Sequence, residues 1–327
     1  LSNQAVGIES TQGSINGLVE NHGLLEAQGG RIIMNSDAID SLHSMVVNNT
    51  GVVRANSMVE VDGKILIMIF EKPSTRTRIS FDLAVKQLGG KSLILNPDEI
   101  HYGSGNESLH DTAKILSTYG NVFMLRTDSD EKLKEFKKHI NIPVINGLSP
   151  SSHPTQVLSD IFTIEEIKKK HISKLNICWI GDANNNVINS LIAASVKFSF
   201  NLNIGCPKKY EPKKTLLSWV KKNRGKVYIF NDVKKAANNA DVIFTDKVIS
   251  MNDKINKAKK IKDFRNFTVT TKIIDCAKRD VIFLHCLPRG SEVSNEVFLG
   301  KHSKVWLQAL NRVYLQKSIL LYCLDKL

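Results

Sequence analysis

Hydroxyl and arginine side chains are concentrated in the stretch Ser74-Thr75-Arg76-Thr77-Arg78, directly after the apolar run Ile65–Phe70. The apolar run predicts a buried strand, and the stretch after it predicts the first turn of a helix. A helix N-terminus that carries free backbone N–H groups, hydroxyls and an arginine favours the binding of a phosphate. The alternative is an ordinary Ser or Thr helix cap with its arginines in solvent.

A second polar group, His153-Pro154-Thr155-Gln156, also opens a predicted helix. His153 and Gln156 are one helical turn apart, so both side chains can point at one ligand. Arg126 ends the predicted strand Val122–Leu125 and is expected to converge on the same place. Taken by itself, His153 could instead be a cap or a core residue.

Two further groups follow predicted strands. His285-Cys286-Leu287-Pro288-Arg289 comes after Val281–Leu284, and its proline makes the turn rigid enough for Cys286 to face a ligand. The alternative for Cys286 is a small buried apolar residue. Gly181-Asp182-Ala183-Asn184-Asn185-Asn186 precedes a predicted helix, but its spacing is not that of a dinucleotide-binding loop.

The elements that must position these groups alternate between strand and helix from Gly63 onward, in two series that meet near residue 150. This alternation predicts an α/β fold of two doubly wound parallel-sheet domains with a cleft between them. Ligands bind beyond the carboxyl ends of the strands in such sheets, which is where the polar groups lie. The expected divisions are 63–150, 151–305 and a closing C-terminal helix within 306–327.

The composition is that of an ordinary globular protein, with 327 residues, 42% hydrophobic and 24% charged. The net charge of +13 comes from scattered lysines, without an arginine-rich arm or a nucleic-acid-binding motif. We therefore expect small anionic substrates as partners, and neither nucleic acid nor a membrane. Five well-separated cysteines without a CxxC pair predict reduced thiols in the cytoplasm and no metal site.

Residues 1–62 differ from the rest, because they contain no Trp, Phe, Tyr, Cys or Pro and are rich in Gly, Asn, Val and Ile. The stretch from Asn21 to Ala27 is echoed from Asn49 to Ala55. Such repetition predicts a short β-rich segment of stacked coils. The segment resembles the β-solenoid repeats of filamentous-haemagglutinin-type secreted adhesins. The alternative is an ordinary β-rich lid.

From about Gly63 to the C-terminus the chain resembles the aspartate/ornithine carbamoyltransferase family. The resemblance rests on three motifs in this order: FEKPSTRTR (Phe70–Arg78), HPTQ (His153–Gln156) and HCLPR (His285–Arg289). Within the family, the cysteine of HCLPR and the asparagine at Asn186 are typical of the ornithine enzymes rather than the aspartate enzymes. The implied activity is carbamoyl transfer from carbamoyl phosphate to the δ-amine of L-ornithine, giving L-citrulline and phosphate in arginine metabolism.

The resemblance also implies a role for each matching residue. The residues implied to bind carbamoyl phosphate are Ser74, Thr75, Arg76, Thr77, Arg126, His153, Gln156 and Arg312. The residues implied to bind ornithine are Asn186, Asp246, Ser250, Met251, Cys286 and Leu287. Among these, Arg126, His153, Cys286 and Arg312 are implied to act in catalysis. The resemblance implies no cofactor, a homotrimer, and a reach of His101 into the neighbouring subunit's site.

This sequence also departs from the family pattern. The family's N-terminal helices, the first of which packs on the C-terminal helix, are replaced by residues 1–62, so we expect exposed apolar surface at Ile319 and Leu320. Val248, Asn252 and Leu310 stand where the family usually has Trp, Gly and Glu. Two alternatives therefore stay open, an inactive gene-fusion remnant that still binds carbamoyl phosphate and a carbamoyltransferase for another amine. A surface adhesion module is a third alternative, from a different class.

Overall fold

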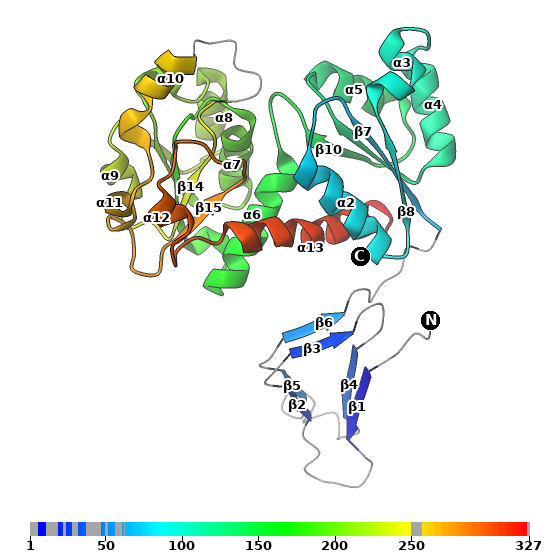
Figure 1. The fold of residues 1–327 in the computed structure, drawn as a ribbon, viewed down its shortest axis with the longest axis horizontal. Helices are drawn as coiled ribbons and strands as arrows, with labels where there is room; N and C mark the ends of the chain where they lie inside the picture. The colour runs from blue at the N-terminus through cyan, green and yellow to red at the C-terminus, as the bar shows by residue number, and fades with distance from the viewer. Residues whose placement is uncertain are drawn as a thin grey trace.

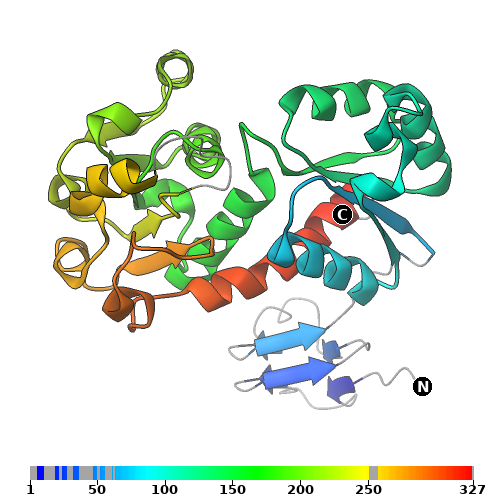
Figure 2. The same cartoon turned by 45° about the horizontal axis from the view of Figure 1, so that its top comes forward.

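The computed structural model describes Val61, residues 63–249 and residues 257–325, together with the backbone of six short strands nearer the N-terminus. Figure 1 shows two α/β lobes side by side, with two long helices, α6 (Pro154–Lys168) and α13 (Val305–Cys323), lying between them. The two helices pack against each other, and α13 also packs against α2 (Thr75–Gln87) of the first lobe. Turning the molecule leaves α13 running from one lobe to the other (Figure 2).

The first lobe contains a four-stranded sheet with the order β10-β9-β7-β8, in which every pairing is parallel. Its strands are β7 (Ile65–Phe70), β8 (Lys91–Leu95), β9 (Val122–Arg126) and β10 (Val144–Leu148). Besides α2, its helices are α3 (His101–Ser104), α4 (Leu109–Tyr119) and α5 (Asp130–His139). The predicted parallel sheet is therefore confirmed for this lobe.

The second lobe contains a five-stranded parallel sheet with the order β13-β12-β11-β14-β15. Its strands are β11 (Asn176–Ile180), β12 (Asn201–Gly205), β13 (Val227–Phe230), β14 (Val242–Thr245) and β15 (Ile282–His285). Its helices are α7 (Asn186–Lys197), α8 (Lys214–Lys222), α9 (Val233–Ala237), α10 (Lys257–Asp263), α11 (Thr271–Ile274) and α12 (Asn295–Phe298). The sequence did not predict the short helices α3, α11 and α12, and α13 begins at Val305, one residue before the expected range 306–327.

Each sheet is buried on both faces, which explains why its central strands are continuous apolar runs. In β7, Leu66 and Met68 face a core shared with α2 and α13, whereas Ile67 and Ile69 face a core shared with α4 and α5. This two-residue alternation follows from strand geometry. Helices on both faces confirm the doubly wound architecture. No described helix is long and apolar enough to cross a membrane.

The C-terminal helix corrects one expectation. Leu320 is fully buried against the α2 face of the first core, so it is not the exposed residue that we expected. Ile319 is half-buried and lines a cavity of about 390 Å³ together with the exposed Tyr322 and with Leu158 of α6. Apolar surface is therefore accessible beside Ile319, whereas the next residue, Leu320, is covered by α2.

The strands before residue 61 pair in parallel, β1 with β4, β2 with β5 and β3 with β6. Their bounds are β1 (Val6–Ser10), β2 (Val19–Asn21), β3 (Leu24–Ala27), β4 (Ile32–Ser36), β5 (Val47–Asn49) and β6 (Val52–Ala55). The two stretches that echo each other in sequence are paired, with Asn21 opposite Asn49 and Leu24 opposite Val52. The solenoid stays a prediction, since most residues of the connecting turns lie outside the described part of the chain.

Candidate functional site

A cavity of about 440 Å³ lies between the two lobes, at the carboxyl ends of their strands. It collects candidate residues from all three motifs, although they come from distant parts of the sequence. The candidate residues that line it are Ser74, Thr75, Arg76, Thr77, Arg126, His153, Gln156, Asn186, Asp246, Cys286, Leu287 and Arg312. The cavity is therefore the candidate active site.

The N-terminus of α2 forms one wall. Ser74 occupies the N-cap position without making a side-chain capping bond, so its hydroxyl is not used by the helix itself. Arg76 is half-buried and donates from Nη2 to the carbonyl oxygen of Leu287 at 2.6 Å, which joins the first lobe to the second. These groups are the ones for which the sequence predicted an anion socket, and the structure places them on the wall of the cavity.

Arg312 of α13 is buried beneath this wall. It donates from Nη2 to Oγ1 of Thr77 at 2.8 Å and from Nη1 to Oε1 of Gln156. The Gln156 amide in turn donates to Asp160 at 2.8 Å, and Gln308 donates to the same carboxylate oxygen at 2.7 Å. The network fixes the orientation of the Gln156 amide, because its nitrogen faces an acceptor and its oxygen faces a donor.

Burial and mutual repulsion perturb the pKa values of the basic groups. Burial, with the charge of Arg76 adding to it, lowers the pKa of Arg126 to about 10. The Nε atoms of Arg126 and Arg312 are buried and have no hydrogen-bond partner within the described residues. Burial and the charges of Arg312, Arg126 and Arg76 hold the pKa of His153 well below its ordinary value. The positive charge of the three arginines therefore favours an anion in the cavity, and His153 is neutral at physiological pH.

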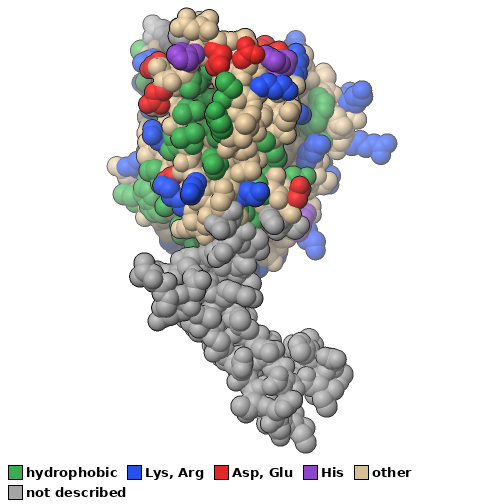
Figure 3. All heavy atoms as spheres, turned by 90° about the vertical axis from the view of Figure 1, so that its right-hand side faces the viewer, with side chains coloured by type: hydrophobic (Ala, Val, Ile, Leu, Met, Phe, Trp, Pro, Cys, Tyr) green, Lys and Arg blue, Asp and Glu red, His purple; other side chains and the backbone are tan. Residues whose placement is uncertain are grey.

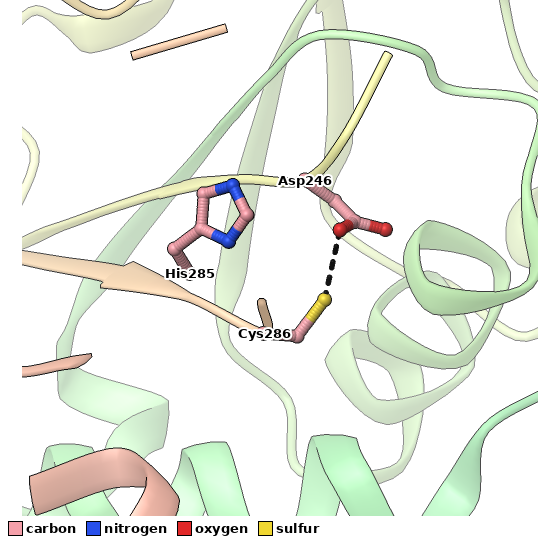
Figure 4. Close-up of side chains that lie close together, drawn as sticks. All are labelled: Asp246, His285 and Cys286. Carbon is pink, nitrogen blue, oxygen red and sulfur yellow. Dashed lines mark hydrogen bonds between the residues drawn. The ribbon is translucent and has the colours of Figure 1, made fainter. Parts of the chain in front are cut away.

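The opposite wall carries a second cluster, made of Asp246 after β14 and His285 and Cys286 at the end of β15 (Figure 4). The Cys286 thiol donates to Oδ1 of Asp246 at 2.9 Å. Burial, followed by the charge of Asp246, raises the pKa of this thiol well above its ordinary value, so Cys286 is not a thiolate. Burial also raises the pKa of Asp246.

Polar atoms of Asp246, His285 and Cys286 lie within 4.8 Å of one another, which is close enough for metal ligation. However, Nδ1 of His285 accepts the N–H of Leu287 at 2.9 Å, and Nε2 lies 2.9 Å from Oε1 of the buried Glu292. Both imidazole nitrogens are therefore engaged in hydrogen bonds. The donor set fits a hydrogen-bonded cluster that shapes the turn after β15 better than it fits a metal ion.

Asn186, the first residue of α7, lines the cavity and donates from Nδ2 to the carbonyl oxygen of Ser149 at 2.9 Å. The candidates Ser250 and Met251 lie outside the described residues, as does Asn252. His101 is exposed on α3 and does not line the cavity.

The other two departures from the family pattern are also away from the cavity. Val248 is buried in the second lobe's core, and Leu310 is exposed on α13. Neither side chain lines the site.

Sequence reasoning missed several supporting residues. Asp160 lies one turn after Gln156 on the same helix, a spacing that could have suggested the contact. Gln308 and Glu292 carry no such local signal, because they reach their partners only through the packing of α13 and of the loop after β15. Lys247 and Asp182 also line the cavity.

Two parallel-sheet lobes with an arginine-rich cavity between them define a class of two-domain α/β enzymes that hold an anionic substrate between their sheets. Two family models match the chain: the carbamoyl-P binding domain of aspartate/ornithine carbamoyltransferase over residues 35–166, and its Asp/Orn binding domain over residues 173–323. The chain belongs to the aspartate/ornithine carbamoyltransferase family. The first match begins inside the segment 1–62, so the expected boundary at residue 62 stays a prediction.

Individual relatives are similar over most of the chain. An ornithine carbamoyltransferase of Mesorhizobium japonicum is 42% identical over 266 residues, which is 81% of this chain and 86% of the relative. One of Methanocorpusculum labreanum is 45% identical over 260 residues, covering 79% and 84%. Among solved structures, the ornithine carbamoyltransferase of Pyrococcus furiosus has a TM-score of 0.76 at 39% identity, covering 82% of this chain and 86% of that one.

Proposed function

We propose that this protein transfers the carbamoyl group of carbamoyl phosphate to the δ-amine of L-ornithine, giving L-citrulline and phosphate. The single observation that carries the proposal is the cavity between the lobes, which gathers the polar residues of all three motifs. The ornithine carbamoyltransferases that are 42% and 45% identical to the chain support the choice of substrates. We assign carbamoyl phosphate to residues 63–150 and ornithine to residues 151–305, with the closing helix packing back on the first domain.

Carbamoyl phosphate is placed against the first lobe. Its phosphate would be held by Arg76 and by the hydroxyls and N–H groups of Ser74, Thr75 and Thr77. Unsatisfied guanidinium nitrogens on Arg126 and Arg312 support a second set of contacts, to the carbonyl oxygen. His153 is neutral, so it would donate a hydrogen bond to that oxygen instead of a proton. Gln156 would hold the carbamoyl amide.

Ornithine is placed against the second lobe. Asn186, Asp246, Ser250 and Met251 would hold its α-amino and carboxylate groups. Cys286 and Leu287 would line the channel for the δ-amine. Because the Cys286 thiol keeps its proton, its part in catalysis is to orient Asp246 and the amine, without forming a covalent bond.

In the reaction, the unprotonated δ-amine attacks the carbamoyl carbon and its lone pair forms the new C–N bond. The developing oxyanion is stabilised by the fixed donors of Arg126, His153 and Arg312. The bond from carbon to the phosphate oxygen then breaks, its electron pair leaves with the phosphate, and the phosphate takes up the proton that the nitrogen loses. In this proposal, positioning and charge stabilisation supply the catalysis, and no cofactor takes part.

Incubating the purified chain with carbamoyl phosphate and ornithine, and measuring citrulline, tests the proposal. L-Aspartate serves as the parallel acceptor. Citrulline formation with no carbamoyl-aspartate is the expected result. Product from aspartate alone would contradict the proposal. No product with either acceptor, from folded protein, would also contradict it, and would leave an inactive gene-fusion remnant or a carbamoyltransferase for another amine as the alternatives.

We propose a homotrimer assembled through the first lobe. Hydrophobic side chains gather on the outer face of this lobe (Figure 3), where β8 is an edge strand. Leu93 of β8 and Ile115 and Tyr119 of α4 are each at least 45% exposed. Such a face favours self-association, and the exposed His101 would then reach a neighbouring site. Light scattering should give three times the chain mass of 36.5 kDa.

We also propose that the protein works in arginine biosynthesis in the cytoplasm. The cysteines of the described residues are free thiols, in keeping with a reducing compartment. A structural relative is described as the anabolic ornithine carbamoyltransferase of Campylobacter jejuni, with a TM-score of 0.76 and 37% identity, covering 83% of this chain and 90% of that one. Growth of an arginine auxotroph that lacks this activity, restored by the chain, tests the role.

A further inference from the structure

Lys260 is a buried lysine on a helix whose other lysines are exposed. On α10, Lys257, Lys259 and Lys262 are exposed, as expected of a lysine-rich surface helix. Lys260 is only 2% exposed. A buried ammonium group is costly unless a counter-charge compensates it. Its Nζ lies 2.6 Å from Oδ2 of Asp182, and both side chains are almost completely buried.

Asp182 belongs to the turn between β11 and α7. Its second carboxylate oxygen, Oδ1, accepts the backbone N–H of Asn184 at 2.9 Å. Its main-chain carbonyl accepts the indole N–H of Trp179 and the side-chain amide of Asn185, both at 3.2 Å. Asn185 in turn caps α7 by accepting two backbone N–H groups. Asp182 therefore contacts the turn through both its carboxylate and its main-chain carbonyl, so its position sets that of the turn.

The turn Asp182–Asn186 contributes residues only to the part of the cavity that is placed against ornithine. Asp182, Asn185 and Asn186 line the cavity from the second lobe, on the side placed against ornithine. The residues placed against carbamoyl phosphate come from α2, β9, α6 and α13 instead. A displacement of the turn would therefore alter the ornithine contacts and leave the phosphate socket in place.

We propose that Lys260, through its buried ion pair with Asp182, is a positioning residue for the amino-acid substrate. It holds the turn Asp182–Asn186 at the distance from the cavity that lets Asn186 reach ornithine. Lys260 does not line the cavity, so it acts on the site through Asp182; its Nζ also lies 5.6 Å from the centre of the Tyr210 ring. The inference rests on the proposed function and deepens it by naming what sets the acceptor half of the site.

Steady-state kinetics of Lys260→Met test the role. Methionine keeps the apolar stem and removes the charge. We expect KM for ornithine to rise on the order of tenfold, as for changes in residues that orient a ligand-binding group, with KM for carbamoyl phosphate unchanged. Lys260→Arg retains the charge and should restore most of the ornithine KM. Lys262→Met, an exposed position on the same helix, is the matched control and should change neither value.

Two outcomes overturn the proposal: an ornithine KM equal to wild type in Lys260→Met, or an equal rise in both KM values. If the single variant does not fold, the double variant Lys260→Met/Asp182→Asn decides. It contains no unpaired buried charge, and its amide oxygen can still accept the N–H of Asn184. It should still show the raised ornithine KM, and a wild-type value overturns the proposal.

A readout without turnover separates this inference from the proposed function. Trp179 is buried and its indole N–H reports directly on the Asp182 carbonyl. The nitrogen-15 indole signal of Trp179 should shift in Lys260→Met and stay in place in Lys262→Met. An unmoved signal in Lys260→Met overturns the positioning role. If the wild-type protein makes no citrulline but the Trp179 signal still shifts in Lys260→Met, only the proposed function is overturned.

Discussion

Arg312 of α13 donates a hydrogen bond from Nη2 to Oγ1 of Thr77 at 2.8 Å, although 235 positions separate the two residues in the chain. The same guanidinium donates to Gln156 of α6. One planar, forked group therefore joins the last helix, α13, to α2 and to α6. A point charge on a flexible stem cannot make both bonds in this geometry.

Arg312→Lys tests this relationship. The substitution keeps the charge but loses one of the two directed bonds, so we expect kcat to fall by about 10²–10³. The KM for carbamoyl phosphate should rise at the same time. Arg279→Lys, on the exposed surface, should leave both constants unchanged. Near-normal kinetics in Arg312→Lys would show that the two simultaneous guanidinium hydrogen bonds are not needed for activity.

Arg76→Ala tests the phosphate socket. A charge-assisted hydrogen bond contributes about 1.5–3 kcal/mol, so carbamoyl phosphate should bind roughly ten- to a hundredfold more weakly. Isothermal calorimetry without ornithine gives this affinity directly. Arg78→Ala is the matched control, because Arg78 lies on the same helix turn but is exposed and outside the cavity. Similar losses in both variants would mean that general positive charge, and not the Arg76 contact, binds the phosphate.

Asp246→Asn tests the division of the cavity into two halves. The substitution removes the carboxylate that would face the ornithine α-amino group and keeps an acceptor for Cys286. We expect KM for ornithine to rise roughly tenfold or more, on the scale of a lost charged hydrogen bond, with the affinity for carbamoyl phosphate preserved. Asp275→Asn, an exposed position, is the control. If both affinities fell together, the assignment of Asp246 to ornithine would be wrong.

His153 makes stability depend on pH. Its pKa is lowered by burial and by three arginines, so the folded protein does not take up the proton that the unfolded chain takes up below about pH 6.5. The stabilisation is complete above that pH and is lost as pH falls toward the folded-state pKa. The loss is about 1.4 kcal/mol per pH unit for one proton.

Urea unfolding of the wild type and of His153→Asn at pH 7.5, 6.5 and 5.5 measures this dependence. The free energy of unfolding should fall more steeply between pH 6.5 and 5.5 in the wild type than in the variant. His302→Asn alters a histidine away from the cavity and should keep the wild-type slope. Parallel slopes for all three proteins would rule out His153 as the titrating group.

Local sequence was sufficient for most of the secondary structure. The run Ile65–Phe70 is a strand with the predicted bounds, because a six-residue apolar run between polar turns fits a strand buried on both faces. The strands predicted at Val122–Leu125 and Val281–Leu284 are observed at Val122–Arg126 and Ile282–His285, within one residue of the predicted bounds. The four-residue helix α11 was missed, since Thr271–Ile274 is too short to show a helical periodicity.

The sequence by itself was enough to predict a phosphate socket at Ser74–Thr77, because such a socket needs only a strand end, a helix start and suitable side chains in consecutive positions. The tertiary structure alone decided how these residues are supported. Burial of Leu320 against α2, the shared acceptor Asp160 and the ion pair of Lys260 with Asp182 all depend on which helices pack together. Burial and electrostatic interaction depend on distances in space, and these distances cannot be deduced from separation along the chain.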